Sequence, residues 1–111
     1  MGLMSGTSMD GLDISIIISD GQKDISFIYD KYFEYDLILK KKIVDLRNKV
    51  LNAHDLVNYS YELELLEREI TLFHAQKINK ILSKLNYQID LIGFHGQTIF
   101  HNPELKITKQ L

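Results

Sequence analysis

The sequence contains no cysteine, a single proline and no long apolar run. Without cysteine, the chain can form neither a disulfide bond nor a thiolate metal site. Its runs of aliphatic residues, such as the isoleucines at 16–18, are far too short to span a bilayer. A formal net charge of −2 gives no electrostatic reason to expect nucleic acid or an anionic membrane as a partner. We therefore expect a cytoplasmic protein with no nucleic-acid or membrane partner.

The composition, with 45% hydrophobic and 25% charged residues, is typical of a folded globular protein. A chain of 111 residues can bury the core of one modest domain and is too short for two of ordinary size. The basic run at 40–42 (KKK) lies among apolar residues at helical spacing. It is either the solvated face of a helix, which the pattern favours, or a patch for an anion or a partner.

Residues 1–35 predict three strands joined by two turns. Met1 to Met4 is short and apolar, and the β-branched run at 12–19 is typical of a strand buried on both faces. Asp20-Gly21 favours a tight turn, and the aromatic-rich segment 25–35 then favours extended structure. This order predicts an antiparallel meander.

Two helices are predicted after the meander. Asp36 is placed to cap a helix whose apolar residues recur at spacings of four, three and four. Asp55 is expected to cap the segment that follows it, and an apolar stripe along 63–85 predicts a long helix that ends at Asn86. Segment 89–94 then returns to a strand. Three strands, two helices and a further strand predict an α/β fold with a mixed sheet.

The stretch GTSMDGLD at 6–13 leads directly into the isoleucine-rich strand. It has neither the lysine of a Walker A loop nor the spacing of GxGxxG. Two interpretations stay open: a hairpin turn, or a loop whose N–H groups converge on an anion. Positive φ and close backbone approach at Gly6 and Gly11 would serve the anion, and Asp10 and Asp13 could hold a magnesium ion. Taken alone, the stretch favours the turn.

A second polar stretch, HGQTIFHN at 95–102, follows the strand predicted at 89–94. Ligands of α/β sheets commonly bind beyond the carboxyl ends of strands, and these donors and acceptors suit a hydroxyl-rich ligand such as a sugar. His95 and His101 have no carboxylate between them, which is a poor arrangement for a metal ion. Loop histidines are more often hydrogen-bonded structural groups. His54 and His74 are interpreted as structural or exposed.

Together the two stretches resemble the N-terminal part of the anhydro-N-acetylmuramic acid kinase family. GLMSGTSMDGLD lies near the start, IGFHGQTIFHNP follows the helices, and the resemblance covers essentially all 111 residues. It implies the actin-like, ribonuclease H-like ATPase fold, with residues 1–111 as the N-terminal portion of the first lobe. It also implies a cytoplasmic sugar kinase of cell-wall recycling, which uses ATP and Mg²⁺ to open the ring of 1,6-anhydro-N-acetylmuramic acid and phosphorylate its O6.

The same resemblance implies roles for individual residues toward two small molecules, a nucleotide and an amino sugar. Asp10 is the expected magnesium ligand, and the catalytic residues stay unassigned. The residues expected to contact the ATP phosphates are Gly6, Thr7, Ser8, Met9, Asp10, Gly11, Leu12 and Asp13. The residues expected to line the sugar side of the cleft are His95, Gly96, Gln97 and Thr98.

The sequence departs from the family in length. The later glycine-rich motif with the water-activating aspartate has no counterpart here, and KITKQL at 106–111 looks like a strand that is just beginning. We therefore expect a fragment without the second lobe, which does not turn over ATP by itself because phosphoryl transfer needs several loops in position. Alternatives are a non-catalytic nucleotide- or sugar-binding module, or half of a split enzyme that pairs with a C-terminal half. An unpaired sheet edge expected after Phe100 favours self-association.

Overall fold

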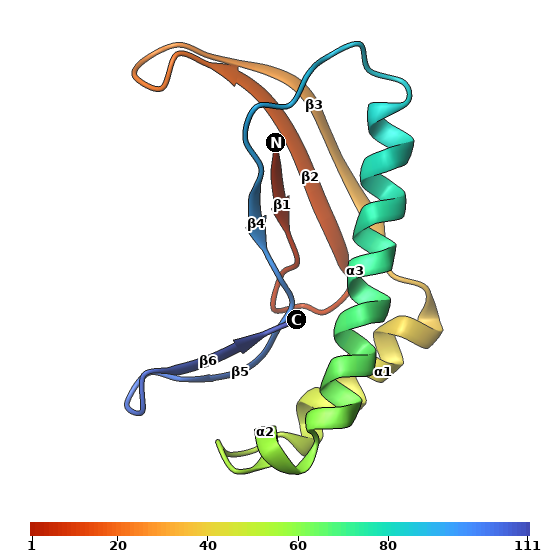
Figure 1. Cartoon of the computed structure of the whole chain (residues 1–111), viewed down its shortest axis with the longest axis vertical. Coiled ribbons are helices and arrows are strands. Elements are labelled where there is room, and N and C mark those ends of the chain that lie inside the picture. The colour runs from red at the N-terminus through yellow and green to blue at the C-terminus, as the bar shows by residue number, and fades with distance from the viewer.

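The computed structural model describes residues 1–111 as an α/β fold with a larger sheet, a separate hairpin and helices that pack against one side of both (Figure 1). None of the helices combines the length and apolar character that a membrane span requires. In chain order the elements are β1 (Gly2–Met4), β2 (Gly11–Ser19), β3 (Ile25–Glu34), α1 (Leu37–Lys49), α2 (Asp55–Asn58), α3 (Ser60–Leu82), β4 (Gly93–His95), β5 (Thr98–Asn102) and β6 (Ile107–Gln110).

The larger sheet has four strands in the order β3-β2-β1-β4. Strand β1 is antiparallel to β2 and β2 is antiparallel to β3, so the predicted meander is confirmed. Strand β4 returns through the helices and lies parallel to β1, which confirms the predicted mixed sheet. Of the strand predicted at 89–94, only Gly93 and Phe94 are paired, and the observed strand continues to His95. Strand β4 is this short because it pairs residue for residue with a β1 of three residues.

The prediction that the strand at 12–19 is buried on both faces is wrong. Leu12, Ile14 and Ile16 are buried, whereas Asp13 and Ile17, on the opposite face, are exposed. The buried face packs against the C-terminal half of α3, where Ile81 joins the same cluster. No helix of this chain covers the other face (Figure 1), so the strand alternates like a strand with one solvated side.

The turn predicted at Asp20-Gly21 is present and spans 20–24. One carboxylate oxygen of Asp20 accepts hydrogen bonds from the amides of Gln22, Lys23 and Asp24 at 2.9, 3.0 and 3.0 Å. These bonds favour the ionised carboxylate and hold the pKa of Asp20 below its ordinary value. Gly21 has a φ of 76°, a conformation that glycine adopts readily.

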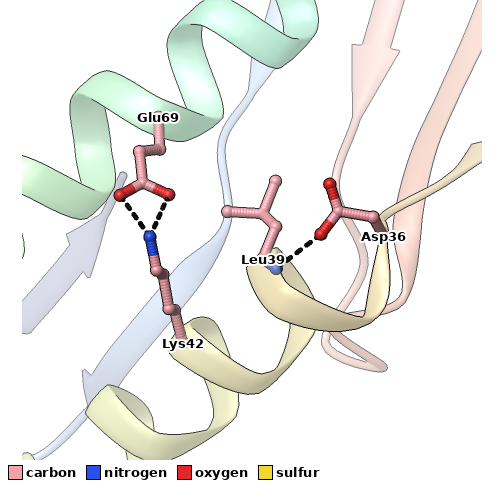
Figure 2. Close-up of polar contacts among 4 residues, drawn as sticks. All are labelled: Asp36, Leu39, Lys42 and Glu69. Atoms are coloured by element: carbon pink, nitrogen blue, oxygen red, sulfur yellow. Dashed lines mark hydrogen bonds and ion pairs between the residues drawn. The ribbon is translucent and has the colours of Figure 1, made fainter.

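Helix α1 begins where the sequence predicts. The Asp36 Oδ1 atom accepts a hydrogen bond from the Leu39 amide at 2.8 Å, which confirms the predicted N-cap (Figure 2). On the exposed side of α1, Lys42 Nζ lies 2.7 and 2.8 Å from the two carboxylate oxygens of Glu69 on α3 (Figure 2). Because both side chains are substantially exposed, this ion pair stabilises the helix pair only weakly. At Lys42, the basic run therefore behaves as a solvated helix face.

The connection to α3 corrects the expectation for Asp55. Its Oδ2 atom accepts from the amides of Leu51 and Asn52 at 2.9 and 3.1 Å, so it closes the turn before it rather than capping the helix after it. His54 occupies the N-cap position of α2 and makes no side-chain cap bond. The long helix is confirmed at 23 residues, but it ends at Leu82 and not at Asn86.

The main core cluster lies between α1, α3 and the β5–β6 hairpin. Ile43 of α1 and Ile70 of α3 are fully buried there, next to Phe100 of β5. Phe100 pairs with Lys109 of β6, and β5 and β6 each have a single strand neighbour, so the hairpin keeps free edges as predicted. Residues 98–102, which the sequence analysis treated as a polar stretch, form a strand with Ile99 and Phe100 turned into the core.

The N-cap gives a first testable prediction. Asp36→Ala is expected to lower the free energy of unfolding by about 1 kcal/mol, because the Leu39 amide loses its acceptor. Urea denaturation measures this change. Asp45→Ala, at an exposed position of the same helix, is the matched control and should change stability by less than about 0.5 kcal/mol. Equal losses in the two variants would argue against the cap.

Candidate functional site

The structure places the two polar stretches next to each other. Met4 and His95 are partners at the ends of the parallel strands β1 and β4, and the Ser5 amide donates to the His95 carbonyl oxygen at 3.1 Å. Residues 5–10 and 96–97 therefore leave adjacent strands at the same end of the sheet (Figure 1). In α/β folds this is the edge where ligands bind.

The first loop, Gly6–Asp10, contains a tight turn. The Met9 amide donates to the Gly6 carbonyl oxygen at 3.2 Å, and Met9 adopts a φ of 57°. Thr7 and Ser8 at the tip are exposed. Ser8 Oγ donates to Asp10 Oδ1 at 2.5 Å, so the turn holds a hydroxyl and a carboxylate together on the solvent side. The loop is both a turn and a cluster of groups that can meet a ligand.

The glycines of this stretch act differently from the prediction. Positive φ was expected at Gly6 and Gly11, but in this loop the left-handed residue is Met9. Gly11 is needed instead for close approach to β3: an added Cβ atom would lie 2.4 Å from the Phe33 carbonyl oxygen and 2.6 Å from the Tyr32 ring. The glycine at position 11 thus lets strand β2 start directly against its neighbour.

The two aspartates of the stretch lie in different settings. The hydrogen bond from Ser8 is the main cause that holds the pKa of Asp10 below its ordinary value, so Asp10 is an anion at neutral pH. Burial and the negative charge of Asp10 raise the pKa of Tyr32. Asp13 belongs to β2 and lies on the open face of the sheet, as the partner of Met4 on one side and Tyr32 on the other. No group of three or more carboxylates and histidines gathers as a metal site.

The second loop is tied to the first by Gln97. Its side chain is fully buried, and its Nε2 donates to the Gly6 carbonyl oxygen at 2.9 Å. Its Oε1 is buried without a hydrogen-bond partner. The backbone of Gln97 exchanges two bonds of 2.9 Å with Leu111, and a Cβ atom at Gly96 would lie 2.2 Å from the Leu111 carbonyl oxygen. Gly96 therefore allows β6 to end against this loop.

His95 and Thr98 lie on either side of that buried segment. His95 is exposed, and Gln110 Nε2 donates to its Nε2 at 2.9 Å. The same Gln110 nitrogen lies 3.2 Å from Thr98 Oγ1, so one amide joins the two residues. His101 is further along β5, where its Nδ1 is 2.9 Å from Thr108 Oγ1, and it belongs to the exposed side of the hairpin.

A shallow depression on the open face of the sheet adjoins both loops. Its lining includes Met4, Asp13 and His95, which stand side by side in the strand register. A second hollow lies at the opposite end of the sheet, between 16–19 and 87–91, and contains none of the residues of the two polar stretches. The depression beside the loops is thus the one connected with their chemistry.

A buried polar cluster behind the first loop is absent from the sequence predictions. Ser5 Oγ lies 2.8 Å from Tyr35 Oη and 3.1 Å from His74 Nε2, and Tyr35 Oη lies 3.3 Å from His74 Nε2. Burial lowers the pKa of His74 to about 4, so the imidazole is neutral at physiological pH. His74 is a structural residue and is not exposed. The burial of His74 could have been predicted from its position four residues after Ile70, on the apolar stripe of α3.

These features define an α/β fold with a candidate ligand site at the carboxyl ends of two neighbouring parallel strands. One loop offers hydroxyls and a carboxylate, and the other offers an imidazole and a hydroxyl, which suits a polar ligand that forms several hydrogen bonds. The chain matches the model of the anhydro-N-acetylmuramic acid kinase family over residues 1–111, and it belongs to that family. This confirms the resemblance carried by the two motifs.

Individual relatives agree with this assignment. The chain is 51% identical over 111 residues to the anhydro-N-acetylmuramic acid kinase of Pelagibacter ubique (strain HTCC1062), an alignment that covers all of this chain and 30% of the relative. It is 36% identical over 118 residues to the kinase of the same name from Agrobacterium fabrum, covering 31% of that protein. The corresponding protein of Brucella suis (strain ATCC 23445 / NCTC 10510) is 37% identical, with the same 31% covered. The chain thus spans about 30% of the length of the curated relatives it matches.

Proposed function

We propose that residues 1–111 supply the phosphate-binding loop and part of the sugar-binding wall of an ATP-dependent kinase that acts on 1,6-anhydro-N-acetylmuramic acid. The observation that carries the proposal is the bond from Gln97 Nε2 to the Gly6 carbonyl oxygen, which joins the two motif loops at one edge of the sheet. A kinase needs its nucleotide and its acceptor in adjacent sites, because phosphoryl transfer depends on positioning.

The finer fold assignment is the actin-like, ribonuclease H-like ATPase fold, in a cytoplasmic enzyme of cell-wall recycling. An antiparallel meander followed by helices and a strand parallel to β1 supports this assignment. In it, residues 1–111 form the N-terminal portion of the first lobe, and the second lobe lies outside them. The phosphate loop then belongs to the β1–β2 connection, between Met4 and Gly11.

The first loop fits a magnesium–nucleotide ligand on its own chemistry. Thr7 and Ser8 at the tip are exposed, and their backbone N–H groups make no hydrogen bond to another backbone group, unlike that of Met9. The anionic Asp10 beside them would repel bare phosphates and therefore calls for a cation between the two. In this role Asp10 holds Mg²⁺, while the rest of 6–13 contacts the phosphates. MgATP supplies the phosphoryl group, and its metal neutralises the charge that develops during transfer.

The second loop forms the sugar side of the same site. His95 and Thr98 offer an imidazole and a hydroxyl to the hydroxyl groups of a sugar, and Gln110 aligns them. Gly96 and Gln97 shape the wall through their backbone, because the Gln97 side chain is turned inward to Gly6. None of the residues 1–111 stands out as the base that activates water, so we infer that this chain alone does not turn over ATP.

Binding measurements on the chain test the proposal. Wild-type chain is expected to bind MgATP more tightly than ATP in EDTA, and Asp10→Asn should remove that difference. Ser8→Ala should weaken MgATP binding about tenfold, the order expected for a lost hydrogen bond to a charged group. Ser26→Ala, an exposed serine of β3, is the matched control and should bind like wild type. Isothermal titration calorimetry gives all of these affinities.

An activity assay completes the test. ADP release in the presence of 1,6-anhydro-N-acetylmuramic acid should stay at background for the isolated chain, and turnover that Asp10→Ala abolishes would contradict the inference that it is inactive alone. Binding of neither nucleotide nor sugar would overturn the proposed loop roles. Activity on co-expression with a separate C-terminal half of a relative would favour the split-enzyme alternative, whereas binding without activity would favour a binding module.

A further inference from the structure

The first loop is held at its start by a side chain that none of the motif roles uses. Ser5 follows β1 and precedes Gly6, and its hydroxyl is completely buried. Its Oγ contacts both Tyr35 Oη, at 2.8 Å, and His74 Nε2, at 3.1 Å. The start of the loop is thereby connected to the end of β3 and to the middle of α3.

The same tyrosine also holds the end of the loop. The Tyr35 amide donates to the Asp10 carbonyl oxygen at 2.8 Å, while the Tyr35 hydroxyl reaches Ser5. Tyr35 thus bridges the two ends of Gly6–Asp10 and fixes the distance between them. The tip, with Thr7 and Ser8, makes no such contacts and faces solvent.

The surroundings of these bonds make them hard to replace. Tyr35 packs edge-on against Phe73 at 4.9 Å between ring centroids, and the His74 ring lies 5.4 Å from the Phe94 ring of β4. Ser5, Tyr35 and His74 are each at most 2% exposed. A buried hydroxyl that loses its partner cannot turn to water instead, so the three groups stabilise one shared arrangement.

We propose that Ser5, Tyr35 and His74 are positioning residues, which hold Gly6–Asp10 in the shape that binds phosphate. Where it concerns the ligand, this inference rests on the proposed function of the loop. Phosphate binding by a short loop requires its N–H groups and hydroxyls to be arranged in advance, since every residue ordered on binding reduces affinity. The network lies behind the loop, buried and away from its exposed tip.

Tyr35→Phe tests this network with the smallest change. It removes one hydroxyl and keeps the ring against Phe73 and the backbone bond to Asp10. Native-state hydrogen exchange at the amides of positions 5, 9 and 35, which close the loop, should become about tenfold faster by local opening. The amides of Leu66 and Ile70 in α3 should keep their wild-type rates. Tyr61→Phe, at an exposed position of α3, is the control and should change none of them.

Ligand affinity is the second measurement. MgATP should bind at least about fivefold more weakly to Tyr35→Phe and to Ser5→Ala than to wild type, and equally well to Tyr61→Phe. Exchange that accelerates equally at the loop and at α3 would mean a general loss of stability and overturn the proposal. So would unchanged loop exchange, or faster loop exchange with unchanged affinity. If wild-type chain binds no MgATP, the proposed function fails, while the exchange rates still decide whether the network holds the loop.

Discussion

Ile70→Ala is expected to lower the free energy of unfolding by about 4 kcal/mol, the upper part of the range for removing a large aliphatic side chain from a core. Ile70 is completely buried in the cluster between α1, α3 and the hairpin. The helix cannot collapse into the space that alanine leaves, because its neighbours are fixed on several different elements. A domain of this size has a total stability of roughly 5–15 kcal/mol, so the loss removes a large part of it.

Urea denaturation followed by far-UV circular dichroism measures the change. Leu72→Ala is the matched control, since Leu72 is on the same helix but 51% exposed, and it should cost less than about 1 kcal/mol. A loss below about 1 kcal/mol for Ile70→Ala would show that the space refills and that the cluster is loosely packed. The comparison also bears on the site, because His74 lies one turn further along α3 and depends on the same packing.

Local signals predicted the helical part of the fold well. The capping position of Asp36 and the apolar stripe of α3 are properties of neighbouring residues, and both are present as expected. The capping role predicted for Asp55 is wrong because an aspartate between two helical segments can accept hydrogen bonds from amides on either side. Here the amides of the preceding turn, at Leu51 and Asn52, are the donors. The donors at Leu51 and Asn52 lie as close in sequence as those of the helix that follows, so proximity alone does not choose between them.

The sequence predicted the two motifs of the site, but not the three-dimensional contacts that hold them together. Position 11 requires glycine because a side chain there would collide with the Phe33 carbonyl oxygen, and position 96 requires it because of the Leu111 carbonyl oxygen. Both are contacts between segments that are distant in the sequence. Ser5 and His74 are 69 positions apart and meet only because α3 packs back against the sheet. The buried polarity behind the loop therefore depends on topology, which periodicity and composition do not specify.

The buried imidazole makes the stability of the fold depend on pH. Burial lowers the pKa of His74 from 6.5 to about 4, so the folded chain takes up this proton only below about pH 4, whereas the unfolded chain takes it up below pH 6.5. Between these values the unfolded state holds more protons, and stability falls as the pH falls. At about 1.4 kcal/mol for each unit, the loss across the window is about 3 kcal/mol.

Chemical denaturation between pH 7 and pH 4 tests this dependence, with His74→Gln as the matched variant. Glutamine can keep a hydrogen bond to Ser5 or Tyr35 and does not titrate, so its stability should stay nearly constant across the window, whereas the wild type should lose about 3 kcal/mol. Asp10 and Asp20 have pKa values below 3.8, so the stability they contribute is lost mainly below this range. Parallel losses in the wild type and His74→Gln would assign the acid sensitivity to another group. A flat wild-type profile would mean that water reaches the imidazole, and that the network behind the loop is less closed than its burial indicates.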